Sequence, residues 1–233
     1  MALVVAFHGA GGNGPSFAAY TGLSRTANRH GFAVLYPTAG SGSHFWSLNR
    51  SMAPDDVGRL RALLPQAERL ACADTARMFA TGVSNGGGFA ARVGCQLAGT
   101  IAAVAPVAGG YRALDPCPAN RRASLLEIHG TADPVVPYEG RGPEHEGNPK
   151  DFVTDWAERD GCSTRTEAER PSRLVLRFHH LACPDGLSVE HVRLQGTDHG
   201  WPGAAPPFPR RNPSGLRVNE VVWRFFAAHR LPR

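Results

Sequence analysis

Three residues that could together activate a hydroxyl group each follow a predicted strand: Ser84, Asp133 and His199. A serine hydroxyl becomes an effective nucleophile when a neighbouring imidazole accepts its proton. The imidazole in turn needs a carboxylate on its other ring nitrogen, which fixes its tautomer and stabilises the imidazolium. If the fold brings these side chains together, they predict acyl transfer through a serine nucleophile.

Ser84 occupies the third position of the segment GVSNG, residues 82–86, which fits the G-x-S-x-G nucleophile elbow. The apolar run 78–83 predicts a buried strand, and residues 89–97 predict a helix. A side chain at either glycine of so sharp a turn would clash with the backbone. By itself the motif leaves open a glycine-rich turn with an incidental serine.

A second glycine-rich loop, residues 8–15, follows the apolar strand Ala2–Phe7. A dinucleotide-binding loop would need an acidic residue at the end of the next strand, but Phe32–Tyr36 leads into proline. The loop fits better as an HG-x-GG segment that turns a backbone N–H toward the substrate oxygen. We therefore expect an oxyanion hole formed by the backbone N–H groups of Ala10 and Asn85.

Strands alternate with helices along the whole chain, which predicts one doubly wound α/β domain over residues 1–233. Loops after parallel strands all lie at the same edge of such a sheet, so the three candidate residues should meet there. The expected strands are 2–7, 32–36, 78–83, 101–107, 124–129, 174–178 and 188–195, the last nearer a sheet edge because it alternates. The expected helices are 16–30, 54–70, 89–97, 152–160 and 218–229.

Other acids and histidines compete for these roles. Asp185 and Asp198 are rival acids, although Asp198 adjoins His199 and neighbours on a loop seldom point at each other. Asp133 itself could be an ordinary turn acid before a proline. The chain has 10 histidines, of which we expect His8, His129, His179 and His191 to be structural or exposed.

Composition narrows the partners. A chain of 233 residues with 42% hydrophobic residues suits one globular domain, and its lack of a long apolar run predicts no membrane helix. The net charge of +5 comes from dispersed arginines, with Lys150 the only lysine, so we expect no nucleic-acid partner. None of the 5 cysteines has C-x-x-C spacing, and we expect neither a metal nor a cofactor.

The cysteines and the N-terminus bear on the cellular compartment. Cys162 and Cys183 bracket a loop and a strand in a region rich in turn residues, and we favour them as a disulfide pair. The first seven residues, MALVVAF, lack a basic segment and a cleavage site, so they predict a buried strand rather than a signal peptide.

The segments FHGAGGN, WSLNRSMAPDDVGRLRALL, FATGVSNGGGFA, APVAGG, IHGTADPVVPY and TDHGWPG resemble the esterase family that holds polyhydroxybutyrate depolymerases and feruloyl esterases. The resemblance covers nearly the whole chain. It implies an α/β-hydrolase fold, a three-layer sandwich with a mostly parallel sheet, in which Ser84, Asp133 and His199 form the triad. It also implies a secreted or periplasmic protein that hydrolyses small or polymeric esters of phenolic, acetyl or hydroxyalkanoate type.

Two further expectations concern substrate contact. Trp46 lies in a polar, glycine-rich loop and Trp201 lies beside His199, and we name both as candidate substrate-binding residues. The aromatic residues of the Trp46 loop could equally cover a sheet edge. A peptidase or an acyltransferase would use the same triad, and an inactive binding domain would leave Ser84 unreactive.

The chain departs from the family in lacking the two strands that usually precede the HG-x-GG strand. Phe32–Tyr36 would then be an edge strand, and its apolar character invites pairing with a second copy. We expect either a homodimer through this edge or a loop, residues 38–49, folded over it. A truncated fragment would instead be poorly soluble. Light scattering separates these outcomes, since a stable monomer contradicts the dimer.

Overall fold

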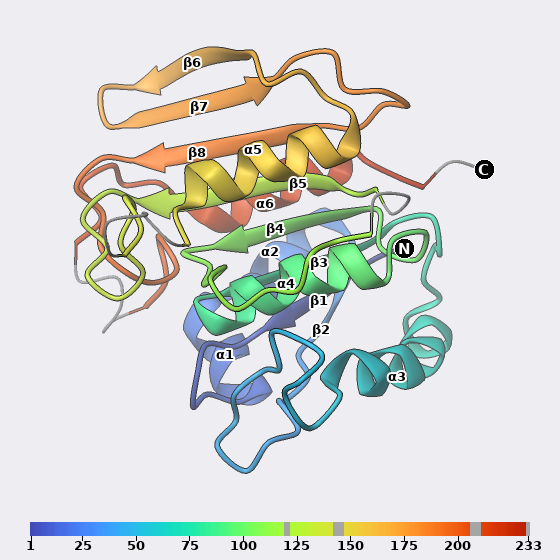
Figure 1. The fold of residues 1–233 in the computed structure, drawn as a ribbon. Coiled ribbons are helices and arrows are strands. Elements are labelled where there is room, and N and C mark those ends of the chain that lie inside the picture. Colours follow the sequence, from blue (N-terminus) through green and yellow to red (C-terminus); the bar gives the residue numbers. More distant parts are fainter. Residues whose placement is uncertain (119–121, 142–146, 206–210, 232–233) are drawn as a thin grey trace.

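The computed structural model describes residues 1–118, 122–141, 147–205 and 211–231. Its centre is an eight-stranded sheet in the order β2-β1-β3-β4-β5-β8-β7-β6 (Figure 1). The first six strands in this order run parallel, and β7 and β6 run antiparallel to their neighbours. The strands are β1 (Ala2–Phe7), β2 (Phe32–Leu35), β3 (Met78–Val83), β4 (Ala103–Val107), β5 (Ser124–Gly130), β6 (Thr166–Ser172), β7 (Val175–His180) and β8 (Val189–Leu194).

Helices cover both faces of the sheet, which confirms the predicted α/β class. The helices are α1 (Gly14–Thr21), α2 (Leu23–His30), α3 (Asp56–Ala71), α4 (Asn85–Gln96), α5 (Pro149–Asp160) and α6 (Val218–Ala227). One core cluster packs α3, α4 and α5 on one face, and a second packs α1, α2 and α6 on the other (Figure 1). The single helix predicted over residues 16–30 is two helices, because Gly22 adopts a left-handed conformation with φ of 60°.

The apolar runs in the sequence have a direct cause in this layering. Alternate residues of β1 enter opposite clusters, with Leu3, Val5 and Phe7 on one face and Ala2, Val4 and Ala6 on the other. A strand covered on both faces has no polar side to alternate with. Every residue of β1, β3, β4 and β5 is buried for this reason.

The two sheet edges differ in character. β2 forms one edge with β1 beside it, as the sequence predicted, and Phe32 is covered by the ring of Trp223 at 4.1 Å between centroids. The other edge, β6, was missed because all seven of its residues are exposed and carry no apolar pattern. The β6–β7 hairpin extends the sheet beyond β8, so β8, expected nearer an edge, lies third from the β6 edge and is mostly buried. Pairing of a second copy along β2 stays a prediction.

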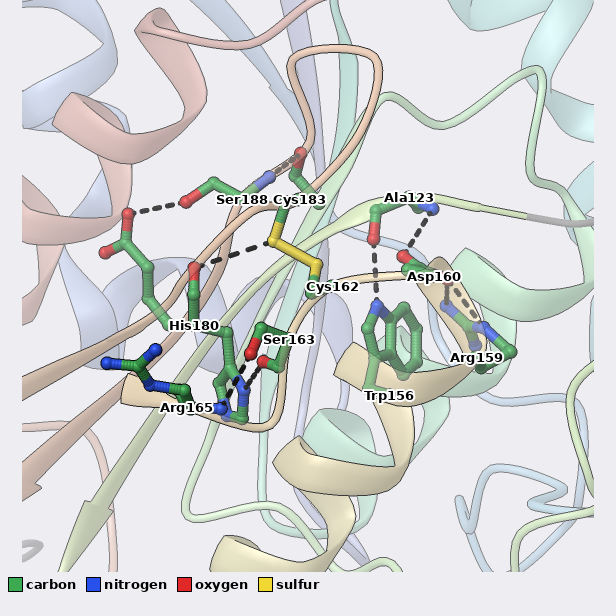
Figure 2. Close-up of a disulfide and its surroundings, with 12 residues drawn as sticks. Ala123, Trp156, Arg159, Asp160, Cys162, Ser163, Arg165, His180, Cys183 and Ser188 are labelled. Atoms are coloured by element: carbon green, nitrogen blue, oxygen red, sulfur yellow. Dashed lines mark hydrogen bonds and ion pairs between the residues drawn. A yellow bond between two sulfur atoms is a disulfide. The ribbon is translucent and has the colours of Figure 1, made fainter. Parts of the chain in front are cut away.

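A disulfide fastens α5 to the segment before β8 (Figure 2). It joins Cys162 to Cys183, the pair favoured from the sequence, and a second disulfide joins Cys95 to Cys117. Near the Cys162–Cys183 disulfide, Trp156 Nε1 donates to the Ala123 carbonyl at 2.9 Å, and Asp160 pairs with Arg159. These contacts hold α5 against the start of β5. Cys72 is an exposed free thiol.

Candidate active site

Ser84 lies between β3 and α4 at a turn that requires glycine on both sides. Its φ of 58° and ψ of −124° lie outside the usual regions for a residue with a side chain. A Cβ on Gly82 would lie 2.3 Å from the Gly86 carbonyl oxygen, and a Cβ on Gly86 would lie 2.3 Å from the His8 carbonyl oxygen. The steric requirement predicted from the elbow motif is therefore present in the structure.

Backbone hydrogen bonds from the neighbouring strand hold this strained turn. The Ser84 N–H donates to the Val107 carbonyl at 3.0 Å. The Ser84 carbonyl accepts from the Gly88 N–H at 3.0 Å and from the Gly110 N–H at 3.1 Å. The end of β4 and the loop after it thus fix the position of the serine.

The structure brings the predicted acid and base into contact. His199 Nδ1 lies 2.7 Å from Asp133 Oδ2, and His199 lines the same cavity as Ser84. Asp133 Oδ1 accepts from the backbone N–H groups of Val135 and Val136, each at 2.8 Å. Burial acts to raise the pKa of Asp133, but hydrogen bonds from His129 and His199 outweigh it and lower the pKa well below its ordinary value.

Neither rival acid bonds to His199 in the structure. The Asp198 carboxylate accepts from the backbone N–H of Arg211 at 3.1 Å, and the Asp198 N–H donates to the Arg211 carbonyl. Asp185 is exposed and pairs with Arg122 at 3.3 Å. Of the three carboxylates considered, Asp133 alone contacts the imidazole.

The two expected oxyanion donors lie on the serine side of the site. Asn85 is the first residue of α4, so its N–H has no acceptor within the helix. Ala10 lies in the loop after β1 and lines the cavity beside Ser84. The Asn85 side chain is occupied elsewhere, because its Oδ1 accepts from the Trp46 N–H at 2.8 Å and its Nδ2 donates to the Trp46 carbonyl.

His8 supports the loop that carries Ala10. Its Nδ1 donates to the Gly9 carbonyl at 2.7 Å, and its Nε2 accepts from the Ala39 N–H at 3.1 Å. A ring nitrogen that accepts cannot carry a proton, so His8 is neutral here. Burial lowers the pKa of His8, which agrees with a neutral ring.

The structure does not place the indoles of Trp46 and Trp201 on the cavity wall. Trp46 is 2% exposed, stacks on Phe89 and donates from Nε1 to the His8 carbonyl. Trp201 is fully buried and donates from Nε1 to Asn219 Oδ1 at 2.7 Å. Both indoles therefore support the loops of the site from behind.

A cavity of about 690 Å³ opens beside Ser84 and His199. None of the described residues that line it is an Asp, Glu, Lys or Arg, and its other large walls are Phe17, Tyr20 and Val135. A second cavity of about 660 Å³ lies between α5 and residues 111–117, and neither Ser84 nor His199 lines it. Among the described residues, no group of His, Cys, Asp and Glu could hold a metal ion.

Sequence reasoning missed a set of buried polar residues behind Asp133. Glu127 and His129 project from β5, and Glu127 accepts hydrogen bonds from Tyr111, His129 and His191. We expected His129 and His191 to be structural or exposed, and both are buried. A charged residue within the apolar strand SLLEIHG was the signal that could have revealed them.

Comparisons with known proteins agree with this fold. The acetyl xylan esterase from Aspergillus awamori superimposes with a TM-score of 0.70 at 16% identity, over 97% of this chain and 89% of that one. The chain has the α/β-hydrolase fold. Residues 1–112 match the family described as esterase PHB depolymerase. The predicted resemblance to the polyhydroxybutyrate depolymerase and feruloyl esterase family is confirmed.

Curated relatives of the chain are also esterases by name. Feruloyl esterase B of Piromyces equi is 31% identical over 161 residues, which cover 62% of this chain and 29% of that protein. Putative esterase NocK of Nocardia uniformis subsp. tsuyamanensis is 27% identical over 235 residues, covering 88% of this chain and 67% of that one. The chain thus spans only part of the length of these relatives.

Proposed function

We propose that the chain is a serine carboxylesterase that works through an acyl-enzyme. The observation that carries the proposal is the 2.7 Å contact between Asp133 and His199 beside a cavity that Ser84 also lines. Ser84 Oγ attacks the ester carbonyl while His199 Nε2 accepts its proton. The N–H groups of Ala10 and Asn85 stabilise the negative charge that develops on the carbonyl oxygen.

The same groups complete the acylation and then carry out the deacylation. His199 returns its proton to the alcohol oxygen as the carbon–oxygen bond breaks, which leaves the acyl group on Ser84. Water then attacks this ester with His199 again accepting a proton. As the second intermediate collapses, His199 gives this proton to Ser84 Oγ and the carboxylic acid is released.

The cavity favours uncharged substrates. Without a charged wall among its described residues, it offers no partner for an ionic acyl group, while Phe17, Tyr20 and Val135 offer apolar contact. Relatives named as feruloyl and acetylxylan esterases support esters of feruloyl or acetyl type, and the match to the esterase PHB depolymerase family supports hydroxyalkanoate esters, small or polymeric. A peptidase or acyltransferase with the same triad is separated by assaying amides and acceptor alcohols beside esters.

The compartment is proposed from the disulfides alone. Two disulfides among the described residues support maturation in an oxidising, secreted or periplasmic environment. In the part of the chain that the structure describes, no helix combines the length and apolarity needed to cross a membrane.

Labelling with a fluorophosphonate tests the nucleophile. The probe should attach to Ser84 in the wild type, and Ser84→Ala should abolish both labelling and hydrolysis of p-nitrophenyl, feruloyl and acetyl-sugar esters. Ser43, an exposed serine on a nearby loop, provides the matched control, since Ser43→Ala should behave as wild type. Attachment at another serine, or full activity in Ser84→Ala, would show that the assignment is wrong.

A further inference from the structure

Asp133 is held from behind by a histidine that the proposed mechanism does not use. His129 Nε2 lies 3.3 Å from Asp133 Oδ2, the same oxygen that contacts His199. That Nε2 also lies 2.9 Å from the Val136 carbonyl oxygen. On the other side of the ring, His129 Nδ1 lies 2.9 Å from Glu127 Oε1. The side chains of Glu127, His129 and Asp133 are fully buried.

The surroundings of His129 determine its charge. Each of its ring nitrogens faces acceptors, namely a backbone carbonyl and the carboxylates of Glu127 and Asp133, whose lowered pKa values keep them ionised. Both nitrogens must therefore carry a proton, which makes the ring an imidazolium. Glu127 supplies the compensating charge, and a buried cation without such a partner would be costly.

The other groups that contact the Glu127–His129 pair do not neutralise the imidazolium. Glu127 accepts from Tyr111 Oη at 2.9 Å and from His191 Nδ1 at 2.7 Å. Tyr138 Oη lies 2.7 Å from His191 Nε2 and can donate to it, so a neutral His191 satisfies both of its bonds. The groups that face His129 are thus two carboxylates and neutral hydrogen-bonding partners.

We propose that His129, supported by Glu127, is a positioning residue for the triad: its positive charge holds the Asp133 carboxylate ionised and aimed at His199. The inference rests on the proposed function and assigns residues to it beyond the triad. Asp133 Oδ1 is already fixed by two backbone N–H groups, so the His129 contact determines how Oδ2 is oriented.

The electrostatics of the pair agree with this role. Burial acts to lower the pKa of His129, but the charge of Glu127 and the hydrogen bond to Asp133 raise it to about 10. Burial acts to raise the pKa of Glu127, but the charge of His129 and its hydrogen bond lower it to about 2. At neutral pH both members of the pair are therefore charged.

Two substitutions separate the charge from the hydrogen bond. His129→Gln places an amide nitrogen near the original Nε2, so it keeps a donor to Asp133 and loses the charge. His129→Asn loses both. We expect kcat to fall about 10-fold in H129Q and about 100-fold in H129N, the range found for residues that orient metal ligands, with KM nearly unchanged.

The pH profile provides a readout that a purely structural role would not move. Without the cation, the Asp133–His199 pair accepts a proton more readily, so the acidic limb of kcat/KM should shift upward by about one pH unit in both variants. Glu127→Gln should also shift the limb upward, because His129 loses its proton when the buried ring no longer has a charged partner. Asp160→Asn changes a fully buried acid that pairs with Arg159 (Figure 2) and does not line the cavity beside Ser84, so it should leave the limb in place.

The outcomes distinguish this inference from the proposed function. A folded H129Q with unchanged kcat and an unmoved acidic limb would overturn the inference while wild-type activity upholds the esterase. A wild type that hydrolyses no ester and does not label at Ser84 contradicts the function itself. If the His129 variants fail to fold, nitrogen-15 NMR of the wild type decides: an imidazolium at pH 7 supports the inference, and a neutral ring overturns it.

Discussion

The two sides of the site are held in place by different kinds of contact. On the serine side, residues 8–12 and 82–88 approach one another through backbone, with glycine wherever a Cβ would collide. On the acid side, residues 127–138 and His199 are held by buried charges and side-chain hydrogen bonds. A close backbone contact requires glycine at particular positions of a short segment, so it leaves a motif in the sequence. A network of charged side chains brings together residues from separate elements and leaves no such motif.

Two histidines show the same contrast. His8 accepts from a backbone N–H and is neutral, while His129 faces acceptors on both sides and is cationic. Burial acts to lower the pKa of both rings, and only His129 has carboxylates close enough to reverse that effect. Burial thus keeps His8 neutral, whereas the neighbouring carboxylates keep His129 protonated.

The largest effect is expected on the acid side. Asp133→Asn keeps the shape of the side chain but favours the wrong tautomer of His199, so kcat should fall on the order of 10⁴-fold, as in the serine-protease triad. Asp198→Asn is the matched control because the Asp198 carboxylate faces Arg211. Steady-state kinetics of the two variants settle the choice of acid, and the assignment is wrong if Asp198→Asn is the more damaging.

On the serine side the sharpest change is steric. A Cβ at Gly86 would lie 2.3 Å from the His8 carbonyl oxygen, so Gly86→Ala should lower the free energy of unfolding by about 3 kcal/mol or more. A Cβ at Gly42 would have no atom within 4 Å, and Gly42→Ala should change stability little. Urea denaturation measures both, and equal stabilities for the two variants would contradict the backbone account.

Removing the Cys162–Cys183 disulfide tests whether the residues around Asp133 depend on this covalent link. Replacing Cys162 and Cys183 by serine should cost about 3 kcal/mol of unfolding free energy on the loop-entropy estimate. The acidic limb of the pH profile should stay in place, because the disulfide does not touch the Glu127–His129 pair. Cys72→Ser removes the exposed free thiol and is the control. A shifted limb in the double variant would mean that the charge network depends on this covalent link.

A further expected effect is a pH dependence of stability. The pKa of His129 is raised from 6.5 to about 10, so its contribution is complete below pH 6.5 and is lost as the pH rises toward 10. The free energy of unfolding should therefore decline between pH 6.5 and about 9, before tyrosines ionise in the unfolded chain. H129Q should show a flatter curve over this window in denaturant titrations. Parallel curves would contradict the charge assigned to His129.

The comparison also explains what the sequence could predict. Ser84, its flanking glycines and the buried strands follow from local patterns, because a sharp turn or a doubly covered strand restricts the residues at each position. The pairing of Asp133 with His199 followed from the shared sheet edge. Strand β6 is exposed along its length and leaves no apolar pattern. Glu127 and His129 lie on one strand, where the charged residue was the only local sign, and their contacts with Tyr111 and His191 could not be predicted because those residues lie on other elements.

Direct trapping of the acyl-enzyme tests the central claim. The wild type is mixed with a slowly hydrolysed p-nitrophenyl ester, quenched in acid within the burst phase and digested with trypsin. The account predicts that the acyl group is found on Ser84, within the peptide of residues 78–92, and that Ser84→Ala shows neither burst nor adduct. Turnover of the ester with no adduct on this peptide, or with an adduct on another residue, would contradict it.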